Sequence, residues 1–98
     1  MDLEIQGQHV EVEPQWRRLV EARAALLAAR HPKLVRLHVT FRHEGHHRLA
    51  GDTVHALANL AGDTVSVTKE GETLDALHGV LDAVERELGR RVEHRRCA

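Results

Sequence analysis

The chain contains very few aromatic side chains, with one Trp, one Phe and no Tyr among its 98 residues. Proteins that bind RNA by stacking bases on a β-sheet need several exposed aromatic rings. Composition therefore excludes that mode of binding. Any RNA would have to be held through its phosphates and its shape.

Cysteine and long apolar runs are also scarce. Cys97 is the only cysteine and has no partner for an internal disulfide, as is usual in a reducing cytoplasm. No apolar run approaches the ~18 residues of a membrane span, and residues 1–4 are acidic where a secretory signal is basic. These features predict a cytoplasmic location and no membrane partner.

Residue patterns typical of catalysis are missing as well. Ser66, the only serine, lies between two valines, and no glycine-rich phosphate loop is present. Nine histidines make some histidine–carboxylate pairs inevitable, so such pairs carry little information. The sequence predicts that the protein is not an enzyme and needs neither a small-molecule substrate nor a cofactor.

A histidine-rich segment, residues 42–48, raises the question of a metal site. The candidate ligands are His43, His46, His47, Glu44 and Asp52. Their spacing matches no closed zinc pattern, no cysteine assists, and the arginines at both ends of the segment would repel a cation. We interpret residues 42–51 as a polar loop and expect no metal.

Charge is abundant and arranged in blocks, although the formal net charge is only −1. Residues 14–48 and 90–98 are basic, whereas residues 1–13 and 49–89 are acidic. Such blocks either present a positive face or neutralise one another across the fold. Charge alone leaves both possibilities open.

The spacing of apolar residues predicts an α+β domain spanning residues 1–98 with the order β-α-β-β-β-α. Alternation indicates strands near residues 2–6, 35–41, 53–60 and 64–69, with a tight turn between the last two. Helical spacing indicates one helix from about Pro14 to Arg30 and a longer one beginning near Thr73. We expect a mostly antiparallel four-stranded sheet with both helices packed on one face.

The same spacing predicts the core. In the first helix the apolar stripe is Trp16, Leu19, Val20, Leu26 and Leu27, with Arg23 projecting within it. The second strand places Val35, Leu37, Val39 and Phe41 on one face. The second helix has Leu74, Leu77, Leu81, Val84, Leu88 and Val92 at intervals of three and four.

The opposite face of the second helix contains acids and arginines, namely Asp75, Gly79, Asp82, Arg86, Arg90 and Glu93. One interpretation is a solvated face with an i,i+4 pair between Asp82 and Arg86. The other is a phosphate-binding face, because the run Arg90, Arg91, His94, Arg95 and Arg96 has only Glu93 to compensate it. Arginine also suits bidentate phosphate contacts.

The chain resembles the ribosome hibernation-promoting factors, also called ribosome-associated inhibitors or sigma-54 modulation proteins. The resemblance spans nearly the whole chain. It is carried by Leu3-Glu4-Ile5-Gln6-Gly7, by Val10-Glu11-Val12, by Arg17, Leu19, Val20, Arg23 and Leu27, and by residues 76–88 with the basic end that follows. It implies a fold like that of double-stranded-RNA-binding domains. It also implies docking in the small-subunit channel where transfer RNA and messenger RNA would lie.

In that family, basic residues of the two helices hold ribosomal RNA. By position, Arg23, Arg86 and Arg90 match them. Relatives have lysine where this chain has Leu26, Ala29 and Ala83, and an aromatic residue where it has Leu74. Further arginines are available to compensate, so the expected RNA-binding residues are Arg23, Arg30, Arg86, Arg90, Arg91 and Arg95.

The resemblance therefore implies a short-form hibernation factor, without the long-form dimerisation domain. It would bind the small ribosomal subunit and its RNA in the A and P sites and inhibit translation. The basic tail, about residues 90–98, is expected to fray. Two alternatives remain: a divergent module that binds another structured RNA, and an adaptor whose arginine-rich helix end meets an acidic protein.

Overall fold

The computed structural model describes residues 1–43 and 52–97, with the side chains of residues 1–43 and 52–91. The elements follow one another as β1 (Asp2–Gln8), α1 (Pro14–Arg30), β2 (Leu34–Arg42), β3 (Asp52–Leu60), β4 (Asp63–Gly71) and α2 (Thr73–Cys97). The predicted order β-α-β-β-β-α is confirmed. Most of the predicted polar loop, residues 44–51, lies outside the described residues, and three of the candidate metal ligands lie there with it.

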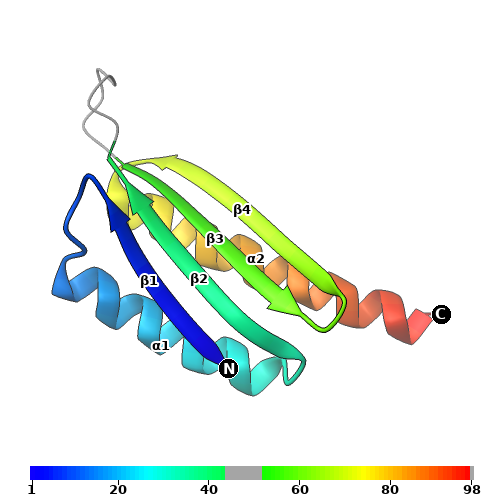
Figure 1. Ribbon diagram of the computed structural model, residues 1–98. Coiled ribbons are helices and arrows are strands. Elements are labelled where there is room, and N and C mark those ends of the chain that lie inside the picture. Colours follow the sequence, from blue (N-terminus) through cyan, green and yellow to red (C-terminus); the bar gives the residue numbers. More distant parts are fainter. Residues whose placement is uncertain (44–51, 98) are drawn as a thin grey trace.

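The four strands form one sheet in the order β1-β2-β3-β4. β1 pairs with β2 in parallel, and the other neighbours are antiparallel. Both helices cover the same face of this sheet, with α1 against β1 and β2 and α2 against β3 and β4 (Figure 1). The predicted arrangement is confirmed, and the other face of the sheet is left without a covering helix.

The core fills the space between the helices and the sheet. Phe41 of β2 stacks on Trp16 of α1, with ring centroids 5.1 Å apart and an interplanar angle of 20°. Leu37, Leu77, Leu81, Leu88 and Phe41 are fully buried, as their spacing predicts. The few aromatic residues of the chain thus contribute to packing, and aliphatic side chains supply the rest of the core.

The prediction that Val35 faces the core is wrong. The pairing of β2 with β3 shifts register between Leu34 and Arg36, which marks a β-bulge or irregularity. A shift of one residue moves a side chain to the opposite side of a strand. Leu34 is therefore 5% exposed and fills the core, whereas Val35 is 53% exposed.

The prediction for Leu26 is also wrong, since its side chain is 50% exposed. The buried residues of α1 are Trp16, Val20, Ala24 and Leu27. At about 100° per residue, Leu26 lies roughly 115° from the centre of that stripe. Ala24 takes its place against the sheet, because a small side chain lets α1 approach closely.

Local contacts fix the end of β1 and the start of α2. β1 continues through Gly7 to Gln8, two residues beyond the predicted strand near residues 2–6. A Cβ atom at Gly7 would lie 2.2 Å from the carbonyl oxygen of Val10, so the turn into α1 needs a glycine there.

At the start of α2, the carboxylate of Glu72 accepts hydrogen bonds from the backbone N–H groups of Leu74 and Asp75. These bonds cap the helix.

The helices differ in length. The backbone of α2 continues to Cys97, through the segment that was expected to fray, and it extends past the β3–β4 turn (Figure 1). Within the described residues, neither helix has a stretch long and apolar enough to cross a bilayer.

Candidate nucleic-acid interface

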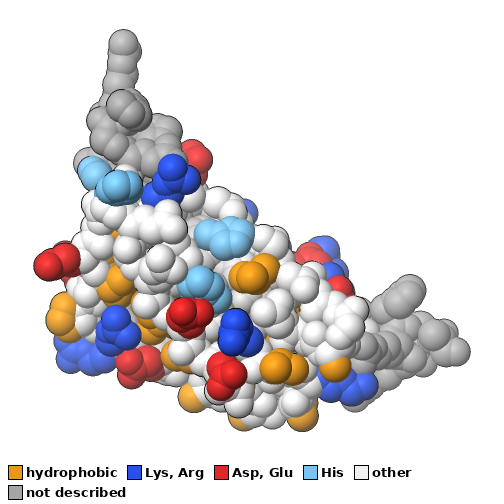
Figure 2. All heavy atoms as spheres, in the orientation of Figure 1, with side chains coloured by type: hydrophobic (Ala, Val, Ile, Leu, Met, Phe, Trp, Pro, Cys, Tyr) orange, Lys and Arg blue, Asp and Glu red, His pale blue; other side chains and the backbone are white. Residues whose placement is uncertain are grey.

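The uncovered face of the sheet carries polar residues of mixed charge. Figure 2 shows basic, acidic and histidine side chains scattered over it, without a continuous basic patch. The strand register places Arg36 and Arg42 on this face with Asp2, Glu4 and Glu70. No Trp, Tyr or Phe side chain lies on it among the residues described, since Trp16 and Phe41 are buried on the helix side, so the sheet lacks the large aromatic rings on which RNA bases usually stack.

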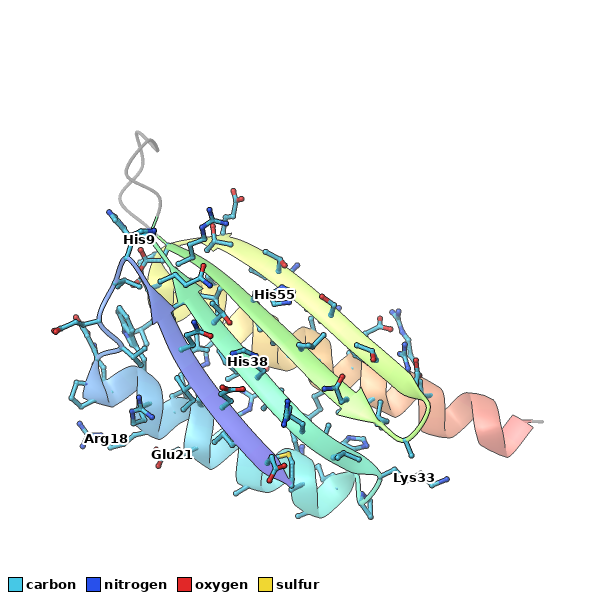
Figure 3. The ribbon with its side chains drawn as sticks, in the orientation of Figure 1. His9, Arg18, Glu21, Lys33, His38 and His55 are labelled. Carbon is cyan, nitrogen blue, oxygen red and sulfur yellow. The ribbon has the colours of Figure 1, made fainter. Side chains whose placement is uncertain are left out.

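Two histidines of this face, His38 and His55, hydrogen-bond to their neighbours within the sheet (Figure 3). Nδ1 of His55 lies 2.7 Å from Oγ1 of Thr68. Nδ1 of His38 lies 3.8 Å from a carboxylate oxygen of Glu4. These contacts hold the two imidazoles within the sheet. Because the open face also has mixed charge, the helix side is the better candidate for an RNA-binding surface.

On the helix side, two arginines of α1 contact two acids of α2. Nη2 of Arg23 donates a hydrogen bond of 2.7 Å to Oδ1 of Asp82 and lies 3.6 Å from Oε2 of Glu85. Arg30 donates to the other carboxylate oxygen of Glu85. We call Arg23, Arg30, Asp82 and Glu85 the interhelix bridge.

The bridge follows from helical spacing. Seven residues separate Arg23 from Arg30, which is about two turns, so both project from the same side of α1. Asp82 and Glu85 are three residues apart and share a side of α2. Each pair is partly exposed to solvent, so each contributes at most about 1 kcal/mol to stability. The i,i+4 pair between Asp82 and Arg86, which belonged to the solvated-face interpretation, does not form; Asp82 binds Arg23 instead.

Arg86 and Arg90 lie on the exposed surface of α2, as predicted. Nη1 of Arg90 donates a hydrogen bond of 2.8 Å to Oε1 of Glu87. Arg86 is the one arginine of α2, among those with described side chains, that forms no ion pair. The acids of α2 therefore partly neutralise the basic face that the sequence indicated, and Arg86 is the exposed arginine of this face that no described acid pairs with.

Arg91 has a different environment from the other predicted RNA-binding residues. Its guanidinium donates to Asp63 at the β3–β4 turn and lies 3.2 Å from Oε2 of Glu87. The hydrogen bond to Asp63 is the main reason that the pKa of Arg91 is raised above its ordinary value. This contact ties α2 to the sheet. The side chain of Arg95, the sixth predicted residue, lies outside the described part of the chain.

Two exposed arginines of α1, Arg17 and Arg18, were not among the predicted site residues. Arg18 lies with Glu21 on the side of α1 away from the sheet (Figure 3), and its Nε–H donates to the carbonyl of Pro14. Within the described part of the chain, neither arginine forms an ion pair. Their position outside the apolar stripe was visible in the sequence and could have identified them.

A separate polar cluster is formed by His43, Asp52 and Thr73. His43 Nδ1 lies 2.8 Å from Oδ1 of Asp52, and the hydroxyl of Thr73 donates 2.7 Å to Oδ2 of the same carboxylate. Asp52 is buried and satisfied by these two partners. Two of the candidate metal ligands therefore bind each other. Among the residues described, no three His, Cys, Asp or Glu side chains group as metal ligands would.

Comparison with known proteins identifies the family. A family model for sigma-54 modulation protein / S30EA ribosomal protein matches residues 3–96. A search of curated proteins found no significant match.

Two solved structures share the fold. A ribosomal subunit interface protein from Coxiella burnetii superposes with a TM-score of 0.81 at 19% identity, covering 95% of this chain and 99% of that one. The N-terminal domain of Protein Y from Thermus thermophilus superposes with a TM-score of 0.76 at 22% identity, covering 92% of this chain and 98% of that one. With a family model that matches residues 3–96, the chain belongs to the sigma-54 modulation protein / S30EA ribosomal protein family.

Proposed function

We propose that this protein is a ribosome hibernation factor that binds the small ribosomal subunit and inhibits translation. The observation that carries the proposal is the family match over residues 3–96. The fold agrees, since the domain aligns over nearly its full length with a protein described as a ribosomal subunit interface protein. The proposed site is the channel of the A and P sites, which the bound domain would occupy without performing chemistry.

The outer surfaces of α1 and α2 are the proposed RNA contact. Arg86 and Arg90 are exposed there, and Arg23 projects from α1 next to Asp82, one turn before Arg86. Phosphate contacts by arginine release counterions, so each one adds about 0.7–0.9 to the slope of log affinity against log salt. The open sheet face carries Arg36 and Arg42 together with Asp2, Glu4 and Glu70, and it serves as the comparison surface in the test.

The test is a pair of charge-reversal variants on opposite faces. Arg86→Glu with Arg90→Glu changes the helix face. Arg36→Glu with Arg42→Glu makes the same change in charge on the open sheet face. Both variants, once shown to be folded by circular dichroism, are sedimented with purified small subunits across a range of salt concentrations. We expect the helix-face variant to lose binding and to show a flatter salt slope, and the sheet-face variant to bind nearly as the wild type does.

Equal losses in the two variants would show that only net charge matters and that the helix face is not the contact. Wild-type protein that never sediments with small subunits would overturn the proposed function itself. A cell-free translation assay, with the same variants added in excess, tests the inhibitory step.

A further inference from the structure

The geometry of the interhelix bridge is that of an occupied anion site. The carboxylate of Glu85 lies between two guanidiniums, with one oxygen bonded to Arg30 and the other 3.6 Å from Nη2 of Arg23. Two arginines that converge on one oxyanion form an arrangement well suited to phosphate, because planar guanidiniums match its oxygens. Here the protein's own carboxylate fills the position.

We propose that Arg23 and Arg30 form a phosphate-binding site and that Glu85 is its internal occupant, displaced when an RNA phosphate enters. Asp82 has a different role: it holds the guanidinium of Arg23 at the site through a hydrogen bond of 2.7 Å. The identity of the phosphate as part of ribosomal RNA rests on the proposed function. Whether Arg23 and Arg30 bind a phosphate at all does not depend on that function.

Exposure makes the displacement possible. The side chain of Arg30 is 58% exposed and that of Glu85 is 30% exposed, so solvent screens their ion pair. The side chain of Arg23 is only 20% exposed, which limits the motion of its stem while Asp82 orients its head. A phosphate can therefore enter from the side of Arg30 with only Glu85 having to move away.

Glu85 then sets the affinity of this part of the surface. Each phosphate that binds between Arg23 and Arg30 must first break the contacts of Glu85, whereas a phosphate at Arg86 breaks no ion pair of that arginine. The contribution of a partly exposed pair corresponds to roughly a 2- to 5-fold change in an equilibrium constant. Removing the charge of Glu85 should strengthen phosphate binding by about that factor.

The first experiment needs no ribosome. Inorganic phosphate is titrated into the folded protein while the side-chain Nε–H signals of Arg23 and Arg30 are followed by NMR. In Glu85→Gln, we expect half-saturation at a phosphate concentration about 2- to 5-fold lower than in the wild type. The matched control is Glu21→Gln, which removes the same charge from an exposed acid of α1 that forms no ion pair among the described residues.

If Glu85→Gln reaches half-saturation at the same phosphate concentration as the wild type, the proposal is overturned. The same holds if Glu21→Gln lowers that concentration as much as Glu85→Gln does. A variant cycle adds a second criterion. If Glu85 acts by occupying the arginine site, its removal should have no effect once Arg30 is replaced by Ala. A gain that persists in the Arg30→Ala background would show that Glu85 acts through general charge and would refute the site.

The second experiment measures binding of the same variants to small ribosomal subunits. Tighter binding by Glu85→Gln than by Glu21→Gln supports use of the site on the ribosome. If the wild type binds subunits and the two variants do not differ, the proposed function stands and the inference about RNA fails. If the wild type binds no subunits, the proposed function fails, and the phosphate titration still decides whether the anion site exists.

Discussion

Leu81→Ala should be among the most destabilising single substitutions in this domain. Leu81 lies in α2 and is completely buried, together with Leu77 and Leu88 on the same helix. The substitution leaves the helix intact, because alanine is a good helix former. Its whole cost therefore comes from the packing between α2 and the sheet.

The expected loss is about 2–5 kcal/mol, the sum of the lost transfer free energy and the cavity that remains. For a domain of this size the total stability is about 5–15 kcal/mol, so the substitution removes a large part of it. A loss of 1 kcal/mol lowers the melting temperature of a small domain by roughly 4–8 °C. The change is therefore well within what thermal or urea unfolding detects.

Leu26→Ala is the matched control, because it makes the same chemical change in α1 at a side chain that is 50% exposed. It should alter stability by no more than about 0.5 kcal/mol. Urea unfolding followed by circular dichroism measures both variants. The slope of unfolding free energy against urea concentration should be the same in both, so that a change in midpoint reports a change in stability. A loss below about half a kcal/mol in Leu81→Ala would refute the packing described for α2. So would equal losses in the two variants.

Two further predictions concern the connections between elements. Gly7→Ala should cost roughly 1–3 kcal/mol in urea unfolding, because its Cβ would lie 2.2 Å from the carbonyl oxygen of Val10. At Gly89, an added Cβ would have no described atom within 4 Å apart from its chain neighbours and the helix's own backbone. Gly89→Ala should therefore gain up to about 1 kcal/mol from helix propensity. Asp63→Asn weakens the contact of Arg91 with the β3–β4 turn. It should cost less than about 1 kcal/mol in low salt, less again in 1 M salt, and the salt dependence is the decisive measurement.

Most of the fold was predictable from the sequence, because each element has a local signal. Pro14 marks the start of α1, and the alternation in residues 37–41 and 54–58 marks two strands with one buried face each. The error at Val35 has a different origin. The register shift beside Val35 arises from the pairing of β2 with β3, and no local pattern encodes it.

The candidate site was predictable only in part. The exposed positions of Arg86 and Arg90 follow from the spacing of the apolar residues of α2. The partners of Arg23 do not, since Asp82 is 59 residues away along the chain and the contact depends on how two helices are placed on the sheet. The same holds for the pair of Arg30 with Glu85 and for that of Arg91 with Asp63. The pair of Arg90 with Glu87 is different, because the two residues are only three apart in α2, and the sequence interpretation overlooked it. The structure places an acid beside each of Arg23, Arg30, Arg90 and Arg91.

The parallel pairing of β1 with β2 has a consequence for how the domain assembles. β2, β3 and β4 follow one another along the chain without an intervening helix among the described residues, and only a tight turn separates β3 from β4. β1 reaches β2 only across the whole of α1, and longer loops cost more entropy to close. β1 is also an edge strand, paired on one side alone. We therefore expect β1 to join the sheet last during folding, and its amide hydrogens to exchange with solvent before those of β2 and β3.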